Sequence, residues 1–225
     1  MGQAVVESDV GVTLVGAGEV DPATLAAALA RAPRLVAADG GADRALAAGH
    51  MPEAAIGDMD SLSAEGRAAL GAARLHRIAE QETTDFDKVL RSVAAPFLLA
   101  VGFTGARLDH TLGAFDALAR HPGRRAVLMG REDAVFLMPP RLELRLAPGT
   151  RLSLYPLGPV EGDSEGLHWP IGGLGFAPGG MTGLSNRTSA AAVRLQVTAP
   201  RMLAILPAGA LDAVLAGLAA APGWG

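Results

Sequence analysis

The sequence contains no cysteine, and only one of its 19 basic residues is a lysine. The lack of cysteine excludes disulfides, thiolate metal sites and cysteine nucleophiles, and it is compatible with a reducing compartment. Aromatic residues make up only 4% of the chain, which argues against stacking platforms for single-stranded nucleic acid. The net charge of −4 also argues against DNA, RNA or an anionic membrane as the main partner.

Long hydrophobic runs are missing as well. No uninterrupted apolar stretch reaches the ~20 residues of a membrane span, and the N-terminal residues lack the basic segment that opens a secretory signal. Because 50% of the 225 residues are hydrophobic, the chain can still bury a substantial core. We therefore expect a cytoplasmic globular protein that binds neither membrane nor nucleic acid.

Short apolar segments alternate with helical segments over the first 138 residues. Asp21 and Pro22 fit the N-cap and first position of a helix that follows the apolar run 11–18. Comparable strand-then-helix patterns recur at 34–49, 54–72, 73–93 and 96–120, and a last apolar run follows at 124–130. Continuous apolar strands between helices predict a parallel sheet covered on both faces.

The pattern changes after about residue 138. Pro139 and Pro140 break the chain, and strict alternation of apolar and polar residues follows at 142–146, 151–155 and 193–197. Such alternation is typical of antiparallel strands in a sandwich. We therefore predict an α/β domain over residues 1–138 and a β-sandwich domain over residues 139–225. The apolar segment 210–220 is expected to form a helix packed on the sandwich or on a partner subunit.

Four polar motifs follow predicted strands. Ligands of open parallel sheets bind outside the carboxyl ends of the strands, where loops and helix N-termini converge. Each motif alone has a structural explanation, as a tight turn, a helix cap or a first-turn residue. The motifs are ADGGA (Asp39, Gly40, Gly41), GDMDS (Gly57, Asp58, Asp60, Ser61), TTDFDK (Thr84, Asp85, Lys88) and GARLDH (Gly105, Arg107, Asp109, His110).

Together the motifs point to a cation. If Asp39, Asp58, Asp60, Asp85 and Asp109 share one crevice, each pair about 4 Å apart repels by about 4 kcal/mol at an effective dielectric of 20. Either several of them stay protonated or a divalent cation lies among them, and oxygen-only ligands favour Mg²⁺. Mg²⁺ often binds one or two carboxylates plus substrate phosphates, which suggests a bound nucleotide. The paired glycines of ADGGA would let backbone amides approach its phosphates.

The single lysine, Lys88, lies beside one of these carboxylates. With Thr84 as the N-cap, Asp85 and Lys88 are three residues apart on one helix face. An ion pair with Asp85 would explain a basic residue here, but an arginine would serve that pair as well. Because a lysine ammonium is compact and can follow a moving phosphate, we favour a phosphate-binding role for Lys88.

The ordered set of motifs resembles the thiamine pyrophosphokinase family. The resemblance covers about residues 12–206 and includes Gln81 before Thr84 and a late GLSN at 183–186. It implies an N-terminal α/β domain, a C-terminal β-sandwich and a homodimer with the substrate between subunits. The activity it implies is Mg²⁺-dependent transfer of a diphosphate from ATP to the hydroxyl of thiamine, releasing AMP.

The resemblance also assigns roles to residues. It implies that Asp58, Asp60 and Asp85 hold Mg²⁺, that Gly40, Gly41, Gln81, Thr84, Lys88 and Arg107 contact ATP, that Asp39 and Asp109 lie at the reacting centre with Lys88 and Arg107, and that Ser185, Asn186 and Asp109 contact thiamine. Some members stack thiamine on a late tryptophan. Here Trp224 stands at the chain end, where fraying is expected, and Trp169 has a strand-like position that predicts packing.

Three alternatives remain open. A diphosphokinase for another hydroxymethyl heterocycle, such as a pterin, would use the first four motifs equally, and only GLSN and the sandwich favour thiamine. A nucleotide-sugar glycosyltransferase also uses a D-x-D metal site but has no need for the TDxxK and RxDH motifs. A non-catalytic thiamine or nucleotide sensor would retain the binding residues without turnover.

Overall fold

The computed structural model describes residues 4–105 and 107–224, and its chain forms two compact units. The first unit comprises the residues up to Ala117 together with Ala126–Arg131. The second comprises Leu118–Arg125 and the chain from Glu132 onward. The domain boundary at residue 138 stays a prediction.

Parallel strands form the centre of the first unit. Parallel pairing joins β7 to β2 and β8, and β4 to β3 and β5, while β2 lies next to β3. Every residue of β2, β4, β7 and β8 is buried, as expected for strands covered on both faces. The strands are β2 (Val12–Val15), β3 (Arg34–Ala38), β4 (Ala54–Gly57), β5 (Leu75–Arg77), β7 (Leu98–Val101), β8 (Ala126–Met129) and a short parallel pair, β1 (Val6–Glu7) with β6 (Val93–Ala94).

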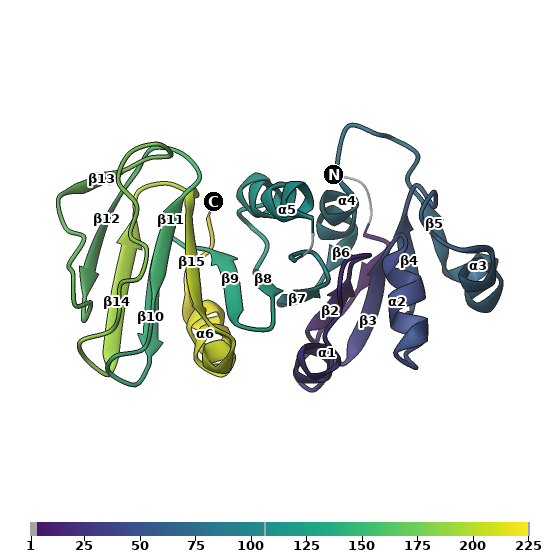
Figure 1. The fold of residues 1–225 in the computed structure, drawn as a ribbon, viewed down its shortest axis with the longest axis horizontal. Coiled ribbons are helices and arrows are strands. Elements are labelled where there is room, and N and C mark those ends of the chain that lie inside the picture. The colour runs from purple at the N-terminus through teal and green to yellow at the C-terminus, as the bar shows by residue number, and fades with distance from the viewer. Residues whose placement is uncertain (1–3, 106, 225) are drawn as a thin grey trace. The chain divides into compact units, whose positions relative to one another are not determined.

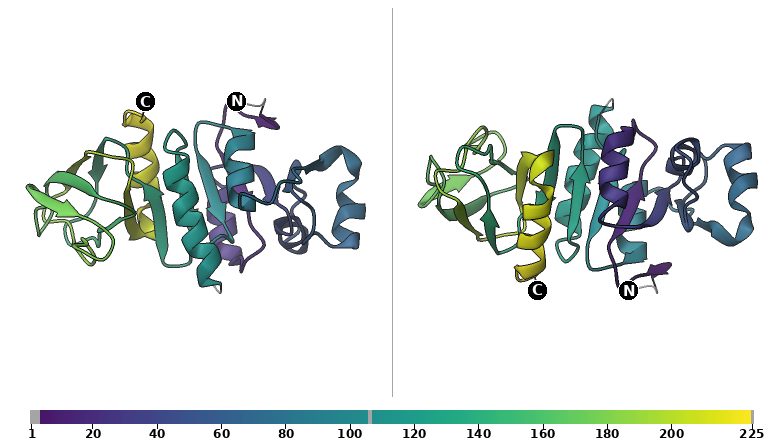
Figure 2. Two further views of the ribbon diagram at one scale, coloured as in Figure 1. Left: turned by 90° about the horizontal axis from the view of Figure 1, so that it is seen from above. Right: turned by 90° about the horizontal axis from the view of Figure 1, so that it is seen from below.

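Helices cover both faces of this parallel sheet. α1 and α2 lie on one face and α4 on the other (Figures 1 and 2). The chain runs outward from β2 to β5 and then returns to β7, on the other side of β2, so the strand order reverses between β2 and β7. Ligands of such sheets bind at this point of reversal. The helices are α1 (Pro22–Leu29), α2 (Gly41–Ala47), α3 (Ala64–Leu70), a 3₁₀ turn (Ala72–Arg74), α4 (Asp85–Ser92) and α5 (Leu108–Arg120).

Capping residues begin three of these helices, and those of α1 and α4 are the residues that the sequence predicts. Asp21 accepts a hydrogen bond from the backbone N–H of Thr24 at 2.9 Å at the start of α1. Ser63 caps α3, and Thr84 caps α4 through a reciprocal capping box with Asp87. Satisfied N–H groups at a helix start stabilise it by about 1 kcal/mol each. The cap at Thr84 also fixes where the motif TTDFDK begins its first helical turn.

The second unit consists of antiparallel sheets and one helix (Figure 1). Burial alternates along β10 and β14, as the period-two pattern predicts, and α6 packs on β10. This part and the parallel sheet confirm the predicted fold class. One sheet holds β9 (Asp133–Leu137), β15 (Met202–Pro207) and β11 (Ser153–Pro156), the other holds β10 (Arg141–Arg145), β14 (Ala192–Val197), β12 (Val160–Glu165) and β13 (Leu174–Phe176), and the chain closes with a 3₁₀ turn (Ala208–Ala210) and α6 (Leu211–Ala220).

Trp224 corrects one expectation about the chain end. Its indole Nε1 donates a hydrogen bond to the carbonyl of Met138 at 2.9 Å, so the predicted fraying of this residue is wrong. A second hydrogen bond, from the Arg125 guanidinium to the Ala221 carbonyl at 3.0 Å, also holds the end of α6.

None of the helices in the described part of the chain has the length and apolar character that crossing a membrane requires.

Candidate active site

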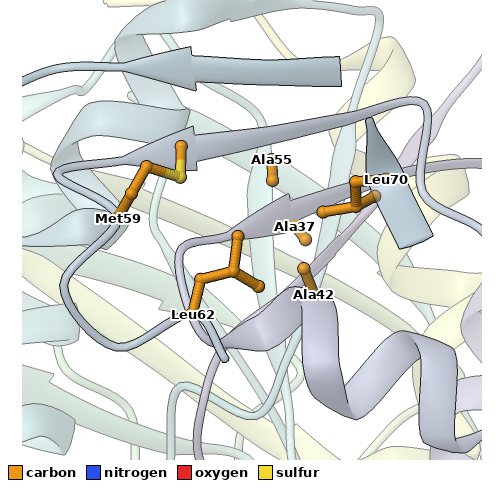
Figure 3. Close-up of a cluster of buried hydrophobic side chains, with 6 residues drawn as sticks. All are labelled: Ala37, Ala42, Ala55, Met59, Leu62 and Leu70. Carbon is orange, nitrogen blue, oxygen red and sulfur yellow. The ribbon is translucent and has the colours of Figure 1, made fainter. Parts of the chain in front are cut away.

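The loop after β4 presents two aspartates because the residue between them is anchored in the core. Met59 is only 6% exposed and packs in a cluster of apolar side chains with Leu62 (Figure 3). Its backbone adopts a positive φ of 69°, an unusual conformation for a residue other than glycine. Asp58 and Asp60 flank this anchor, and neither belongs to the apolar cluster. The other cluster members are Ala37, Ala42, Ala55 and Leu70, with Leu75 packed against them.

Asp39, directly after β3, is buried beside this loop. Its backbone also has a positive φ, 43°, and its N–H donates to the carbonyl of Ile56 at 3.0 Å. A side chain at Gly57 would bring its Cβ within 2.8 Å of the Cβ of Asp39, so a glycine is required there. Oδ2 of Asp39 accepts a hydrogen bond from the backbone N–H of Ser61 at 3.1 Å. Oδ1 is buried and has no hydrogen-bond partner among the described residues.

The glycines of ADGGA are packed tightly. A Cβ on Gly41 would lie 2.0 Å from the carbonyl oxygen of Val15, and one on Gly40 would lie 3.0 Å from the carbonyl oxygen of Ser61. The absence of side chains therefore lets α2 begin against the end of β2. This packing requirement exists whether or not the backbone amides also bind a phosphate.

Three carboxylates converge at the ends of β3 and β4. One oxygen each of Asp39, Asp58 and Asp60 lies within 4.8 Å of the other two. Burial, together with the neighbouring charges of Asp85 and Asp58, raises the pKa of Asp39 to about 6 despite the opposing hydrogen bond from the Ser61 N–H. The geometry thus brings together residues that the sequence analysis placed at the metal and at the reacting centre. A cation among these oxygens would remove their mutual repulsion.

Lys88 joins this cluster to α4. Its side chain is only 2% exposed, and its ammonium lies 3.1 Å from Oδ1 of Asp85 and 3.3 Å from Oδ2 of Asp58. The i,i+3 pair with Asp85 weighed in the sequence analysis therefore exists, together with a second pair to a residue 30 positions away. The same Oδ2 of Asp58 accepts a hydrogen bond from Gln81 at 2.7 Å. Three predicted motifs are thus connected by direct contacts.

Opposing influences set the protonation of these groups. Burial raises the pKa of Asp58, but hydrogen bonds from the Asp60 N–H, Gln81 and Lys88 outweigh it and bring the pKa to about 2. Burial raises the pKa of Asp85, although Lys88 opposes that rise. Desolvation lowers the pKa of Lys88, but its two carboxylate partners raise it more. Lys88 is therefore a charged ammonium at neutral pH.

Packing connects the fourth motif to the third. The ring of Phe103, in the loop after β7, lies 4.5 Å from the ring of Phe86 in α4. A Cβ on Gly113 of α5 would lie 3.7 Å from the methyl group of Thr84. The first half of α5, at Gly113, is thus adjacent to the start of α4.

Three glycines at the point of strand-order reversal, Gly16, Gly18 and Gly102, were not predicted from the sequence to lie at the site. The N–H of Gly18 donates to the carbonyl of Gly102 at 3.0 Å, and a Cβ on Gly16 would lie 2.5 Å from that oxygen. The loops after β2 and β7 can approach this closely only without a side chain at Gly16. The signal in the sequence was a glycine at the end of each of two apolar strands.

Arg107 and Asp109 lie at the exposed start of α5. They form a bidentate ion pair, with Nε to Oδ1 at 3.2 Å and Nη2 to Oδ2 at 2.6 Å. Arg107 lowers the pKa of Asp109. In the described chain, no hydrogen bond or ion pair connects either residue to the three converging carboxylates. His110, next in sequence, is exposed as well.

The GLSN motif belongs to the second unit and organises a tryptophan. Asn186 is buried, and its side chain accepts from the N–H of Trp169 at 3.2 Å and donates to the carbonyl of Trp169 at 2.7 Å. Trp169 is 53% exposed, so the prediction that it serves packing is wrong. The Arg187 guanidinium lies 5.3 Å from the indole centroid and the His168 ring 4.4 Å away. Ser185 is exposed, has a φ of 59°, and donates its N–H to Ser153.

Comparison with known proteins agrees with this arrangement. A family model described as the catalytic domain of thiamin pyrophosphokinase matches residues 25–128, which include the converging carboxylates and Lys88. Residues 25–128, just under half of the chain, are thus similar to the thiamin pyrophosphokinase catalytic domain. The matched range ends within β8, and the second unit lies almost wholly beyond it.

Plant members of the thiamin pyrophosphokinase family are similar in sequence. "Thiamine pyrophosphokinase 1" of Oryza sativa is 27% identical over 166 residues, which cover 65% of this chain and 62% of the rice protein. The Arabidopsis thaliana protein of the same name is 28% identical over 156 residues, covering 61% and 58%. The alignments therefore span about three fifths of the length of these relatives.

Solved structures of family members share the fold over more of the chain. The thiamin pyrophosphokinase of Candida albicans has a TM-score of 0.73 at 15% identity and covers 90% of this chain and 93% of its own. A family protein of Enterococcus faecalis has a TM-score of 0.67 at 25% identity, covering 89% and 98%. The similarity therefore extends through the second unit.

Proposed function

We propose that this protein transfers a diphosphate group from ATP to the hydroxyl of thiamine, in the presence of Mg²⁺, giving thiamine diphosphate and AMP. One observation carries the proposal. Asp39, Asp58 and Asp60 direct oxygens to one place, and one buried oxygen of Asp39 has no partner in the described chain. A buried polar atom without a partner is unfavourable, so this geometry is suited to a ligand.

The donor set fits Mg²⁺. Its groups are carboxylate oxygens without a sulfur or a histidine pair, which suits a hard divalent cation. Asp58 and Asp60 would hold the ion, as the resemblance implies, and we assign Asp39 as a third ligand because its carboxylate oxygen lies close to theirs. Asp85 would reach the ion only by sharing its carboxylate with Lys88. When bound, the ion would neutralise charge on the phosphate oxygens.

The residues of the chain would bind and orient the reactants. In the reaction, the thiamine hydroxyl oxygen forms a bond to the β-phosphorus, the bond between the β-phosphorus and the oxygen bridging to the α-phosphorus breaks, and AMP leaves with that oxygen. Such a transfer depends mainly on in-line positioning and on neutralising charge. Gln81, Thr84 and Lys88 border the carboxylates, and we assign them to the phosphates, with Gly40 and Gly41 supplying backbone amides.

Arg107 and Asp109 would act together. Asp109 is the candidate acceptor of the hydroxyl proton, a contribution of about 10² to 10⁴ in rate. Its pKa is lowered by Arg107, which makes it a poor base while the pair is intact. We infer that Arg107 turns to a phosphate when ATP binds, which would release Asp109 for the hydroxyl.

The thiamine side of the site is assigned to the second unit. We propose that the protein is a homodimer and that Ser185 and Asn186 of one subunit face thiamine bound at the catalytic residues of the other. Asn186 has most of its side-chain hydrogen bonds with Trp169. Its contribution to thiamine binding would therefore be to position Trp169 and the neighbouring backbone.

A direct assay tests the proposed activity. The purified chain is incubated with ATP, Mg²⁺ and either thiamine or a hydroxymethylpterin, and AMP and the diphosphorylated product are quantified. We expect AMP and the diphosphorylated product to form with thiamine but not with the pterin. Neither product should form in the presence of excess EDTA. Formation of AMP with the pterin only would identify the pterin, and not thiamine, as the substrate.

Two variants test whether turnover depends on the converging carboxylates. Asp58→Asn removes one charge from the converging carboxylates, whereas Asp9→Asn makes the same chemical change at an exposed residue outside them. We expect the first to abolish turnover and the second to retain it. Tight thiamine binding without AMP in the unmodified protein would identify a sensor and refute the catalytic proposal.

A further inference from the structure

The position of Lys88 implies that it already acts as a cation of the site. Its ammonium contacts Asp85 at 3.1 Å and Asp58 at 3.3 Å, and its side chain is 2% exposed. A buried charge of this kind is retained only where carboxylates pair with it. Lys88 therefore offsets part of the negative charge that Asp39, Asp58 and Asp60 concentrate nearby.

The same contacts mean that a divalent cation would compete with Lys88 and Gln81 for the carboxylate of Asp58. Oδ2 of Asp58 is shared by Lys88 at 3.3 Å and Gln81 at 2.7 Å, and Oδ1 accepts from the N–H of Asp60 at 3.2 Å. A divalent cation that binds Asp58 must therefore take an oxygen that already has partners, and it must approach the positive charge of Lys88. By contrast, Oδ1 of Asp39 has no partner within the described chain, so the cation gains this ligand without displacing anything.

We propose that Lys88 is the built-in counter-cation of the metal-free site and that it makes tight binding of the divalent cation depend on a phosphate-bearing ligand. Phosphate oxygens would draw the ammonium away from Asp58, and the freed carboxylate would then bind the ion. By thermodynamic linkage, the ion and the phosphate ligand strengthen each other's binding to the same degree. The inference rests on the proposed function for the identity of the phosphate ligand, which is a nucleotide.

The structure offers a matched control on the same helix. Arg91 is one turn nearer the end of α4 and pairs with Glu80 at 2.5 Å on the exposed side. Replacing Arg91 by methionine removes one positive charge from α4 without touching Asp58 or Asp85. Any general effect of net charge on metal binding will therefore appear in both Arg91→Met and Lys88→Met.

The experiment measures metal binding without turnover. Mn²⁺ is titrated into the full chain by calorimetry or electron paramagnetic resonance, first alone and then with a non-hydrolysable ATP analogue. We expect Lys88→Met to bind Mn²⁺ alone at least tenfold more tightly than the unmodified protein and Arg91→Met. We also expect the analogue to strengthen Mn²⁺ binding less in Lys88→Met than in the unmodified protein, because its coupling through Lys88 is lost.

Thermal unfolding gives a second measurement. Without metal, Lys88→Met should melt at a lower temperature than Arg91→Met, since its buried carboxylates have lost their partner. Excess Mn²⁺ should restore most of the difference, because the ion replaces the missing ammonium. Lys88→Gln, which is also neutral, should show the same restoration.

Several results would overturn the proposal. Equal or weaker binding of Mn²⁺ alone to Lys88→Met would show that the ammonium does not compete with the ion. A variant that remains unfolded in excess Mn²⁺ would show that Lys88 is purely structural. If these results occur while the unmodified protein still forms thiamine diphosphate, only the role of Lys88 is refuted. Failure of the unmodified protein to bind Mn²⁺ even with the analogue would instead refute the metal site of the proposed function.

Discussion

Asn186 binds the backbone of Trp169 at both its N–H, at 3.2 Å, and its carbonyl, at 2.7 Å. The Asn186 side chain thus supplies both backbone hydrogen-bond partners that a neighbouring strand would otherwise provide to Trp169, a residue that is 53% exposed. Buried polar groups that lose their partner destabilise a protein by about 1 to 3 kcal/mol. The conformation of this exposed tryptophan therefore depends on one buried amide.

Asn186→Ala should consequently lower the free energy of unfolding by about 1 to 3 kcal/mol. Chemical denaturation followed by circular dichroism measures the change. An ionised Asn186→Asp retains the acceptor and loses the donor to the Trp169 carbonyl, whereas the protonated form can donate through its O–H. The loss of stability should therefore be intermediate when the carboxyl group is protonated. An alanine variant as stable as the unmodified protein would show that the bonds to Trp169 contribute nothing.

Met59 should matter for metal binding beyond its contribution to stability. Met59→Ala removes the buried anchor between Asp58 and Asp60 and should lower the free energy of unfolding by about 2 to 5 kcal/mol. It should also weaken Mn²⁺ binding at least tenfold, since the flanking aspartates lose their fixed orientation. Leu62→Ala, in the same apolar cluster, is the control and should reduce stability with little change in metal affinity. Equal metal affinities in the two variants would contradict the anchoring role.

Asp39 should make the metal-free protein less stable as the pH rises. Its pKa in the folded protein is about 6, against an ordinary value of 3.8. A raised pKa stabilises the fold fully below the unfolded value, and this contribution is lost as the pH rises through the folded value. From well below pH 3.8 to above pH 6 the whole loss amounts to about 3 kcal/mol, most of it between pH 4 and pH 7. In Asp39→Asn this component should be absent, so the stability difference between variant and unmodified protein should change with pH in that window. A constant difference would mean that Asp39 titrates normally.

Lys88→Arg should fold, because a guanidinium keeps a positive charge between Asp85 and Asp58. Its planar fork cannot follow a phosphate as a compact ammonium does. We expect at least a tenfold loss in the rate of AMP formation, about 1.4 kcal/mol of transition-state stabilisation. Arg91→Lys makes the reverse change on the same helix and should leave the rate unaffected. Unchanged turnover in Lys88→Arg would show that Lys88 serves only as an ion-pair partner of the aspartates.

Sequence patterns predicted most of the elements and the approach of Asp39, Asp58 and Asp60, because both follow from local rules. Apolar runs, capping residues such as Thr84, and the rule that loops converge at the carboxyl ends of strands are all readable along the chain. The positive φ of Met59 and the burial of its side chain were not predicted, since both depend on packing against residues distant in sequence. The same holds for the second partner of Lys88, which is 30 residues away.

Exposure was the property least accessible from sequence. Trp169 has a strand-like context, which favours packing, but its burial depends on which segments cover it. Trp224 stands next to the chain end, which favours fraying, but it is held by a single long-range hydrogen bond to Met138. Strand β9 was not predicted; residues 130–132, which include Arg131 and Glu132, separate it from β8.

Binding of Mn²⁺ in the presence of a non-hydrolysable ATP analogue tests most directly whether the aspartates share one cation. The unmodified protein and Asp9→Asn should bind one ion with the same affinity. Asp58→Asn should bind it at least tenfold more weakly and should still fold, although its melting temperature falls because Lys88 loses one of its two carboxylate partners. Unaltered affinity in Asp58→Asn, or a variant that unfolds instead of losing the ion, would contradict the account and leave Asp58 as a structural residue.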